Sequence, residues 1–157
     1  MSPRDHGPAP ILDEVSKRII DQLQEDGRRP YAAIGKAVGL SEAAVRQRVQ
    51  RLLESGVVQI VAVTDPLQVG FSRQAMIGLR TGGPLTEVAD QLAAMPEVDY
   101  VVVTAGSFDI LCEVVCEDDD DLLNLVSTRI RTIPGVVSTE TFVYLKLRKQ
   151  LYNWGTR

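Results

Sequence analysis

The sequence has very few histidine, cysteine and aromatic residues. Its 157 residues include one histidine, two cysteines and only 5% Phe, Trp and Tyr. The histidine, His6, lies in the proline-rich, polar residues 1–10, which we expect to form a disordered arm. Catalytic triads, histidine metal sites and histidine acid–base chemistry are therefore excluded from the rest of the chain, and we expect no catalytic residue and no metal.

The two cysteines and the lack of long apolar runs indicate where the protein works. If their segment is a strand, Cys112 and Cys116 lie about 13 Å apart at ~3.3 Å per residue, too far for a disulfide. We expect both to be buried, free thiols in a reducing compartment. No apolar run approaches the roughly 20 residues of a membrane span, and we recognise no secretory leader. The sequence predicts a soluble, cytoplasmic protein without a membrane partner.

The net charge of −4 hides an uneven distribution of charge along the chain. Residues 1–64 carry nine Lys and Arg against eight Asp and Glu, whereas residues 65–157 carry eight against thirteen. Residues 28–51 alone carry six basic side chains against Glu42, a net charge of +5. A short basic segment of this kind favours nucleic-acid binding in spite of the acidic total.

The first half of the chain predicts three helices. Apolar residues recur at helical spacing in three segments, which end near Gly27, Gly39 and Gly56. Pro30 precedes the second helix, expected over residues 31–38, and Ser41 caps the third, expected to end at residue 54. The apolar positions are Leu12, Val15, Ile19 and Leu23 in the first segment and Ala32, Ile34 and Val38 in the second, and the buried stripe expected in the third consists of Val45, Val49, Leu52 and Leu53.

These helices are typical of a helix-turn-helix domain, which we expect over residues 11–56. The outward face of the third helix presents Arg and Gln, which can make paired hydrogen bonds to base edges in the major groove, and the small Ala43 permits close approach. Lys36 and Ser41 are better placed for phosphate. The alternative is an ordinary charged solvent face, which the neighbouring helices disfavour. The predicted DNA-binding residues are Lys36, Ser41, Glu42, Ala43, Arg46, Gln47, Gln50 and Arg51.

After residue 56 the apolar pattern takes the period of β-strands. Strands are predicted over residues 57–64, 73–81, 98–105, 108–117 and 137–146, with helices after residue 84 and over 118–132. From residue 71 to 147 the order is therefore βαββαβ, a ferredoxin-like arrangement, and the whole chain is of the α+β class. Residues 57–70 are expected to form a linking strand or hinge, and residues 148–157 a polar, aromatic tail.

Three local features of this half carry further expectations. Gly106 and Ser107 predict a two-residue hairpin turn. The following strand has apolar residues on both faces, with Phe108 expected to share the face of Ile110, Cys112 and Val114, so a second subunit is expected to cover one side of the sheet. The acidic residues 117–121 lack the spacing and the glycine of a calcium loop, and we interpret them as a helix cap.

Five motifs resemble those of the Lrp/AsnC (feast-or-famine) family of bacterial transcriptional regulators. Over residues 11–150 they occur in the family's order. The motifs are Leu12-Asp13; Ile-Gly-Lys-Ala-Val-Gly-Leu-Ser at residues 34–41; Arg-Val-Gln-Arg-Leu at 48–52 before Gly56; Gly-Ser-Phe-Asp at 106–109; and Ile-Pro-Gly-Val at 133–136, followed by Thr-Glu-Thr at 139–141.

The resemblance implies a DNA-binding domain, a linking strand exchanged between subunits and a ligand-binding domain that assembles dimers into octamers. It also implies an amino-acid effector, rather than a cofactor, bound where dimers meet. Asp109 can accept hydrogen bonds from the ammonium group of the effector, and backbone N–H groups can donate to its carboxylate. Alternatively, Gly106 is only a turn glycine and Asp109 a solvated strand residue. The implied effector residues are Thr104, Gly106, Ser107, Asp109, Thr139 and Thr141.

Two alternatives remain beside a DNA-binding regulator. Proteins resembling this family include enzymes that decarboxylate sirohaem with histidines in the body of the fold, and this sequence has no histidine there. The other alternative is a ligand-binding protein that has lost DNA binding. The retained Arg46, Gln47 and Arg51 argue against it.

Overall fold

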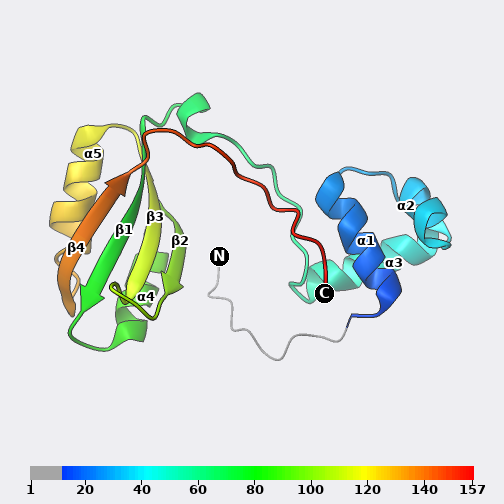
Figure 1. The fold of residues 1–157 in the computed structure, drawn as a ribbon, viewed down its shortest axis with the longest axis horizontal. Helices are drawn as coiled ribbons and strands as arrows, with labels where there is room; N and C mark the ends of the chain where they lie inside the picture. The colour runs from blue at the N-terminus through cyan, green and yellow to red at the C-terminus, as the bar shows by residue number, and fades with distance from the viewer. Residues whose placement is uncertain (1–11) are drawn as a thin grey trace. The chain divides into compact units, whose positions relative to one another are not determined.

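The computed structural model describes residues 12–157, so the predicted disordered arm with His6 lies outside the described residues. The chain forms two compact units, each with its own core (Figure 1). One unit consists of residues 12–63 and the tail, residues 148–157, and the other of residues 64–147. Between residues 12 and 157, no helix is long and apolar enough to cross a membrane.

The first unit contains the three expected helices, α1 (Glu14–Glu25), α2 (Tyr31–Val38) and α3 (Glu42–Glu54). Asp13 caps α1, because its carboxylate accepts a hydrogen bond of 2.7 Å from the Ser16 N–H. Ser41 caps α3, as predicted, by accepting from the Ala44 N–H at 3.3 Å. The core of the unit consists of Ile19, Leu23, Ile34, Val38, Val45 and Val49.

The turn between α2 and α3 depends on two glycines. Gly39 ends α2 with a φ of 79°, in the left-handed region that glycine adopts without strain. The carbonyl of Gly35 accepts from the N–H groups of both Gly39 and Leu40, at 2.8 and 2.9 Å. A Cβ added to Gly35 would lie 2.5 Å from the carbonyl oxygen of Leu40, so only glycine allows this approach.

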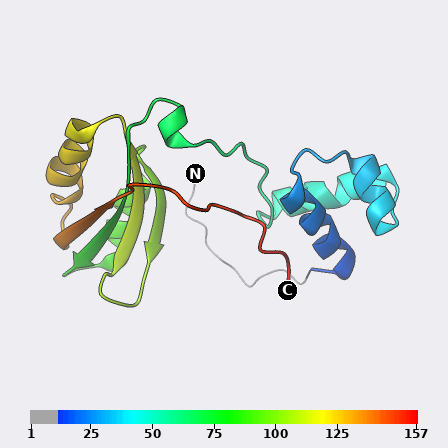
Figure 2. The ribbon, with the colours of Figure 1, turned by 45° about the horizontal axis from the view of Figure 1, so that its top comes forward.

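The second unit contains four strands, β1 (Arg73–Thr81), β2 (Val98–Val103), β3 (Ile110–Cys116) and β4 (Val136–Val143). They form one antiparallel sheet in the order β2-β3-β1-β4. Helix α4 (Leu85–Ala93) and helix α5 (Asp119–Asn124) cover one face of it (Figures 1 and 2). The predicted βαββαβ order and the α+β class are confirmed.

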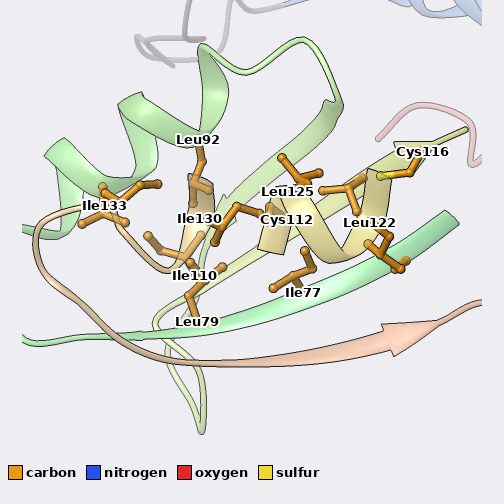
Figure 3. Close-up of a cluster of buried hydrophobic side chains, with 13 residues drawn as sticks. Ile77, Leu79, Leu92, Ile110, Cys112, Cys116, Leu122, Leu125, Ile130 and Ile133 are labelled. Atoms are coloured by element: carbon orange, nitrogen blue, oxygen red, sulfur yellow. The ribbon is translucent and has the colours of Figure 1, made fainter. Parts of the chain in front are cut away.

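The core of this unit lies between the helices and the sheet (Figure 3). The sequence predicts one regular helix over residues 118–132, but α5 continues as a π-helix, η2 (Leu125–Ile130), in which the Arg131 N–H donates to the Val126 carbonyl at 3.0 Å. The wider turn brings Leu125 and Ile130, five residues apart, onto the core face, with 1% and 0% exposure. The apolar positions predicted for a regular helix here, Leu122, Val126 and Ile130, do not include Leu125.

Asp118 caps α5, so the interpretation of the acidic run as a helix cap is confirmed. Its carboxylate accepts from the Asp121 N–H at 2.8 Å. Three further acidic residues occupy the first turn of the helix, where its dipole stabilises negative charge.

The strand predicted over residues 57–64 is wrong for a single chain. This segment has no regular structure, and only a short 3₁₀ helix, η1 (Pro66–Gln68), precedes β1. Its sequence is rich in β-branched residues, but a strand forms only where another strand pairs with its backbone. Ile60, Val61 and Val63 are instead 46%, 69% and 59% exposed.

The two-residue turn predicted at Gly106-Ser107 is also wrong. Residues 104–109 form a wider connection, which closes where the Thr104 N–H donates to the Asp109 carbonyl at 2.8 Å. A Gly-x hairpin turn requires a glycine with positive φ, and Gly106 is not one of the positive-φ glycines.

Phe108 lies in this connection and faces the opposite side of the sheet from the prediction. A Cβ on Gly78 would lie 2.7 Å from the Phe108 ring, and Gly78 alternates with the core residues Ile77 and Leu79. The ring therefore covers the face without helices, where it packs edge-on against Phe142 with centroids 6.0 Å apart. Because Phe108 precedes β3, strand alternation does not govern its direction.

Replacement of Gly35 by alanine is predicted to destabilise the first unit by about 1–3 kcal/mol, the usual cost of overpacking. The added methyl group meets the Leu40 carbonyl, which is backbone and cannot rotate away. Urea denaturation measures the effect. Gly106→Ala is the control, because its Cβ would meet nothing within 4 Å. Equal losses in the two variants would contradict the close-approach argument.

Both cysteines are free and buried, as expected, and are predicted to resist alkylation in the folded protein. Burial raises the pKa of Cys112 to about 12 and that of Cys116 to about 11. The reactive thiolate is therefore scarce at neutral pH, and iodoacetamide should modify the native protein more than about 100-fold more slowly than the denatured chain. Mass spectrometry after timed labelling measures both rates, and comparable rates would show that the thiols are accessible.

Candidate DNA-binding surface and effector loop

The outward face of α3 carries the predicted DNA-binding residues. The helix buries Val45, Val49 and Leu52, so the residues between them point away from the core. Lys36 of α2 and the cap residue Ser41 are exposed beside this face. The structure thus leaves all eight predicted side chains exposed: Lys36, Ser41, Glu42, Ala43, Arg46, Gln47, Gln50 and Arg51.

Arg46 is held by two groups on this surface. Its guanidinium donates to Glu42 at 2.8 Å, and it lies 5.2 Å from the ring centroid of Tyr31. The ion pair is exposed on both sides, and such pairs contribute little, so Arg46 can exchange Glu42 for another acceptor at small cost. The contact of Tyr31 with Arg46 was not predicted from the sequence. The sequence places Tyr31 only at the start of α2, directly after Pro30.

Other arginines of the basic segment serve the fold instead of an outward surface. Arg48 donates to Asp13 at 2.6 Å and to the Ser16 hydroxyl at 3.1 Å, and this contact lowers the pKa of Asp13 to about 2. Arg29 pairs with Glu25 at 3.0 Å. The count of +5 therefore overstates the positive charge available to a ligand.

The connection between β2 and β3, residues 104–109, is fixed to the end of β1. The Asp109 N–H donates to the Leu79 carbonyl at 2.9 Å. Its carboxylate oxygen Oδ2 accepts from the N–H of Thr81 at 2.7 Å and from the hydroxyl of Thr81 at 3.4 Å. Within residues 12–157 the second oxygen, Oδ1, accepts no hydrogen bond. The end of β1 thus orients the Asp109 carboxylate and leaves its oxygen Oδ1 available to accept a hydrogen bond from a ligand.

The remaining effector candidates lie in the connection between β2 and β3 and in β4, and they differ in how close they are to Asp109. Thr104 donates its hydroxyl to the Phe108 carbonyl at 2.6 Å, whereas Gly106 and Ser107 form the exposed tip of the connection. In β4, Thr139 pairs with Leu79 and Thr141 with Ile77. Asp109 and Thr139 therefore flank the same residue of β1, while Thr141 lies further along it. The exposed tip shows that one chain does not enclose this group of residues.

An acidic cavity of about 620 Å³ in the same unit was not predicted from the sequence. Its walls are residues before β1 and the adjoining ends of β2, β3 and α5. Arg129 pairs with Glu97 and lowers the pKa of that carboxyl, whereas burial raises the pKa of Asp99. Burial, together with nearby Asp121 and Glu97, also raises the pKa of Cys116. These carboxylates therefore account for part of the low reactivity expected of Cys116.

Comparison with known proteins finds two family domains in the chain. An AsnC-type helix-turn-helix domain matches residues 12–53, and a C-terminal dimeric alpha+beta barrel domain of AsnC-type regulators matches residues 71–157. The HTH-type transcriptional regulator FL11 of Pyrococcus horikoshii is 38% identical over 141 residues, which cover 88% of this chain and 93% of that protein.

Solved structures share the fold. An AsnC family transcriptional regulator from Agrobacterium tumefaciens has a TM-score of 0.74 and 25% identity, with 89% and 94% of the two chains covered. A transcriptional regulator from Neisseria meningitidis, in a complex with L-Met, has a TM-score of 0.79 and 24% identity, with 91% and 96% covered. With its exposed α3 face, its sheet topology and these matches, the chain belongs to the Lrp/AsnC family of DNA-binding transcriptional regulators.

Proposed function

We propose that this regulator binds duplex DNA as a dimer or larger assembly, with α3 in the major groove, and that an amino acid modulates its affinity for DNA. The exposed face of α3, held at a fixed crossing by Gly35, is the observation that carries the proposal. The family membership and two free, buried cysteines support a site of action in the cytoplasm.

The side chains of α3 divide by the contacts they can make. Arg46 and Gln47, with Gln50 one turn further along, suit base edges in the major groove. Arg can donate to the two acceptors of guanine, and Gln can both donate to and accept from adenine. Ser41 and Lys36 lie at the start of this face and suit phosphates. The small Ala43 would permit close approach at the N-terminal turn, Glu42 could accept from a base amino group, and Arg51 would add a phosphate contact further along.

The face of the sheet without helices supports dimerisation. Its residues include Phe142, 44% exposed, and the Phe108 ring that covers Gly78. The matching C-terminal domain is described as a dimeric barrel, and a second copy would bury this face. A dimer would place two α3 helices on half-sites of a pseudo-palindrome, about one helical turn apart. Further contacts between dimers would give the octamer.

The effector would bind where dimers meet, at residues 104–109. Asp109 Oδ1 would accept from the ammonium group, N–H groups at Gly106 and Ser107 would donate to the carboxylate, and Thr104, Thr139 and Thr141 would complete the site. The exposed tip requires a second dimer to enclose the ligand, so binding would be coupled to assembly and thereby to DNA affinity. The L-Met complex of the Neisseria regulator supports an amino acid.

The variant Arg46→Ala tests the assignment of α3. Loss of one base contact should cost about 1–3 kcal/mol of binding free energy and relax the preference at one position of the site. Binding sites selected from random-sequence duplexes give the preference of each protein. Arg131→Ala, which removes one exposed charge from the other unit, should leave the preference unchanged. An Arg46→Ala protein that selects the wild-type sequence would remove Arg46 from base recognition.

The variant Asp109→Asn tests the effector site. Asparagine keeps an oxygen for the Thr81 N–H but loses the charge that would hold an ammonium group, so affinity for the amino acid should fall at least about tenfold. A thermal-shift screen of the twenty amino acids on the wild type identifies the ligand, and calorimetry measures the loss. Asp99→Asn, a carboxylate outside the proposed site, is the control. An unchanged affinity, or no response of the wild type to any amino acid, would overturn the assignment.

A further inference from the structure

The tail, residues 148–157, changes the charge of the unit that carries α3. Residues 12–63 contain eight Lys and Arg against seven Asp and Glu, a net charge of only +1. The tail adds Arg148, Lys149 and Arg157 and no acidic residue, and it belongs to the same compact unit, whose net charge becomes +4. Residues 64–147, by contrast, carry five basic residues against thirteen acidic ones.

Most basic side chains of the three helices already have partners within the unit. Among its described residues, Lys17 pairs with Glu14, Arg29 with Glu25, Arg46 with Glu42 and Arg48 with Asp13, and Arg18 donates to the Ala37 carbonyl. This leaves Arg28, Lys36 and Arg51 without an ion pair or a side-chain hydrogen bond to a described residue. Three such cations are few, because duplex DNA is bound largely through phosphate contacts.

In the described part of the chain, Arg148 and Lys149 also make no ion pair or side-chain hydrogen bond. With them, the unit has five cationic side chains, instead of three, without an ion pair or a side-chain hydrogen bond to a described residue. The tail also presents Tyr152 and Trp154, which pack edge-on with centroids 6.3 Å apart and are 52% and 74% exposed. The tail therefore offers positive charge and exposed rings together.

The tail is attached to the helices at its end. The Gly155 N–H donates to the side-chain oxygen of Gln24 at 3.0 Å, and the Thr156 hydroxyl donates to the carboxylate of Asp21 at 3.2 Å. Both acceptors lie on α1, so the two hydrogen bonds hold the tail against the first helix of the DNA-binding bundle. Arg148 and Lys149 precede these hydrogen bonds by six to eight residues and are grouped with the same compact unit.

We propose that the tail is a second DNA-binding element, in which Arg148 and Lys149 contact phosphates of duplex DNA beside the site of α3. The inference rests on the proposed DNA binding by α3 and adds contacts that carry no sequence information. Duplex DNA is the favoured occupant because it presents one negative charge per about 1.7 Å of its axis to a unit of net charge +4.

Binding of a random-sequence duplex, measured by fluorescence anisotropy at several salt concentrations, tests the proposal. The variants are Arg148→Gln, Lys149→Gln and the double variant, and Arg131→Gln is the control that removes one exposed cation elsewhere. Each lost phosphate contact should reduce the slope of log affinity against log salt by about 0.9, and the double variant should bind at least about tenfold more weakly near 0.1 M salt. The preference selected by α3 should stay the same.

Three results would contradict the proposal that the tail contacts DNA phosphates. If the wild type binds DNA and the double variant keeps its affinity and salt slope, Arg148 and Lys149 do not contact phosphate. If the double variant loses mass in light scattering, the tail contacts a second copy of the chain instead. If Arg131→Gln weakens binding equally, the effect is one of net charge alone. A wild type that binds no duplex at all would instead refute the proposed function.

Discussion

The close approach of Gly35 to the Leu40 carbonyl is the constraint on which the proposed DNA-binding surface depends. It allows α2 and α3 to cross with only a short turn between them, and it lets one carbonyl accept two N–H groups. The crossing buries Val45 and Val49 against α1 and α2 and thereby fixes which side of α3 faces outward. Arg46, Gln47 and Gln50 gain their common direction from this packing, not from contacts of their own.

In the other unit, β1 has the same organising role. It pairs with both β3 and β4, and its last residues receive the connection that ends in Asp109. The N–H and hydroxyl of Thr81 orient one carboxylate oxygen of Asp109 and leave the other available. A strand end that is rigid through its neighbours can hold a ligand group more precisely than the exposed tip at Gly106. In both units, contacts of the backbone therefore orient polar side chains: Gly35 with Leu40 orients the outward face of α3, and the end of β1 orients Asp109.

Local signals in the sequence were sufficient for most helices and strands, but not for residues 57–64, for the Gly106-Ser107 turn or for every contact. Ser41 and Gly39 predicted the ends of the helices that bind DNA, because caps and left-handed glycines act within a few residues. The direction of Phe108 and the π-helix at Leu125 depend on packing against residues far away in the chain, and no local period encodes them. Residues 57–64 have the composition of a strand, but pairing with another strand, and not composition, creates one.

The charge of the chain shows why counting residues is weaker than assigning their partners. The total of −4 is the sum of +4 on the unit with α3 and −8 on residues 64–147, since Arg4 and Asp5 cancel in the remainder. Within the positive unit, Arg48 and Arg29 are neutralised by neighbouring carboxylates, so the basic segment supplies less free charge than its composition suggests. The pair of Arg48 and Asp13 also joins α3, on which Arg46 stands, to the start of α1. The arginines that serve the fold and the cations proposed to contact DNA are therefore distinct sets, and only the second set should determine the salt dependence of binding.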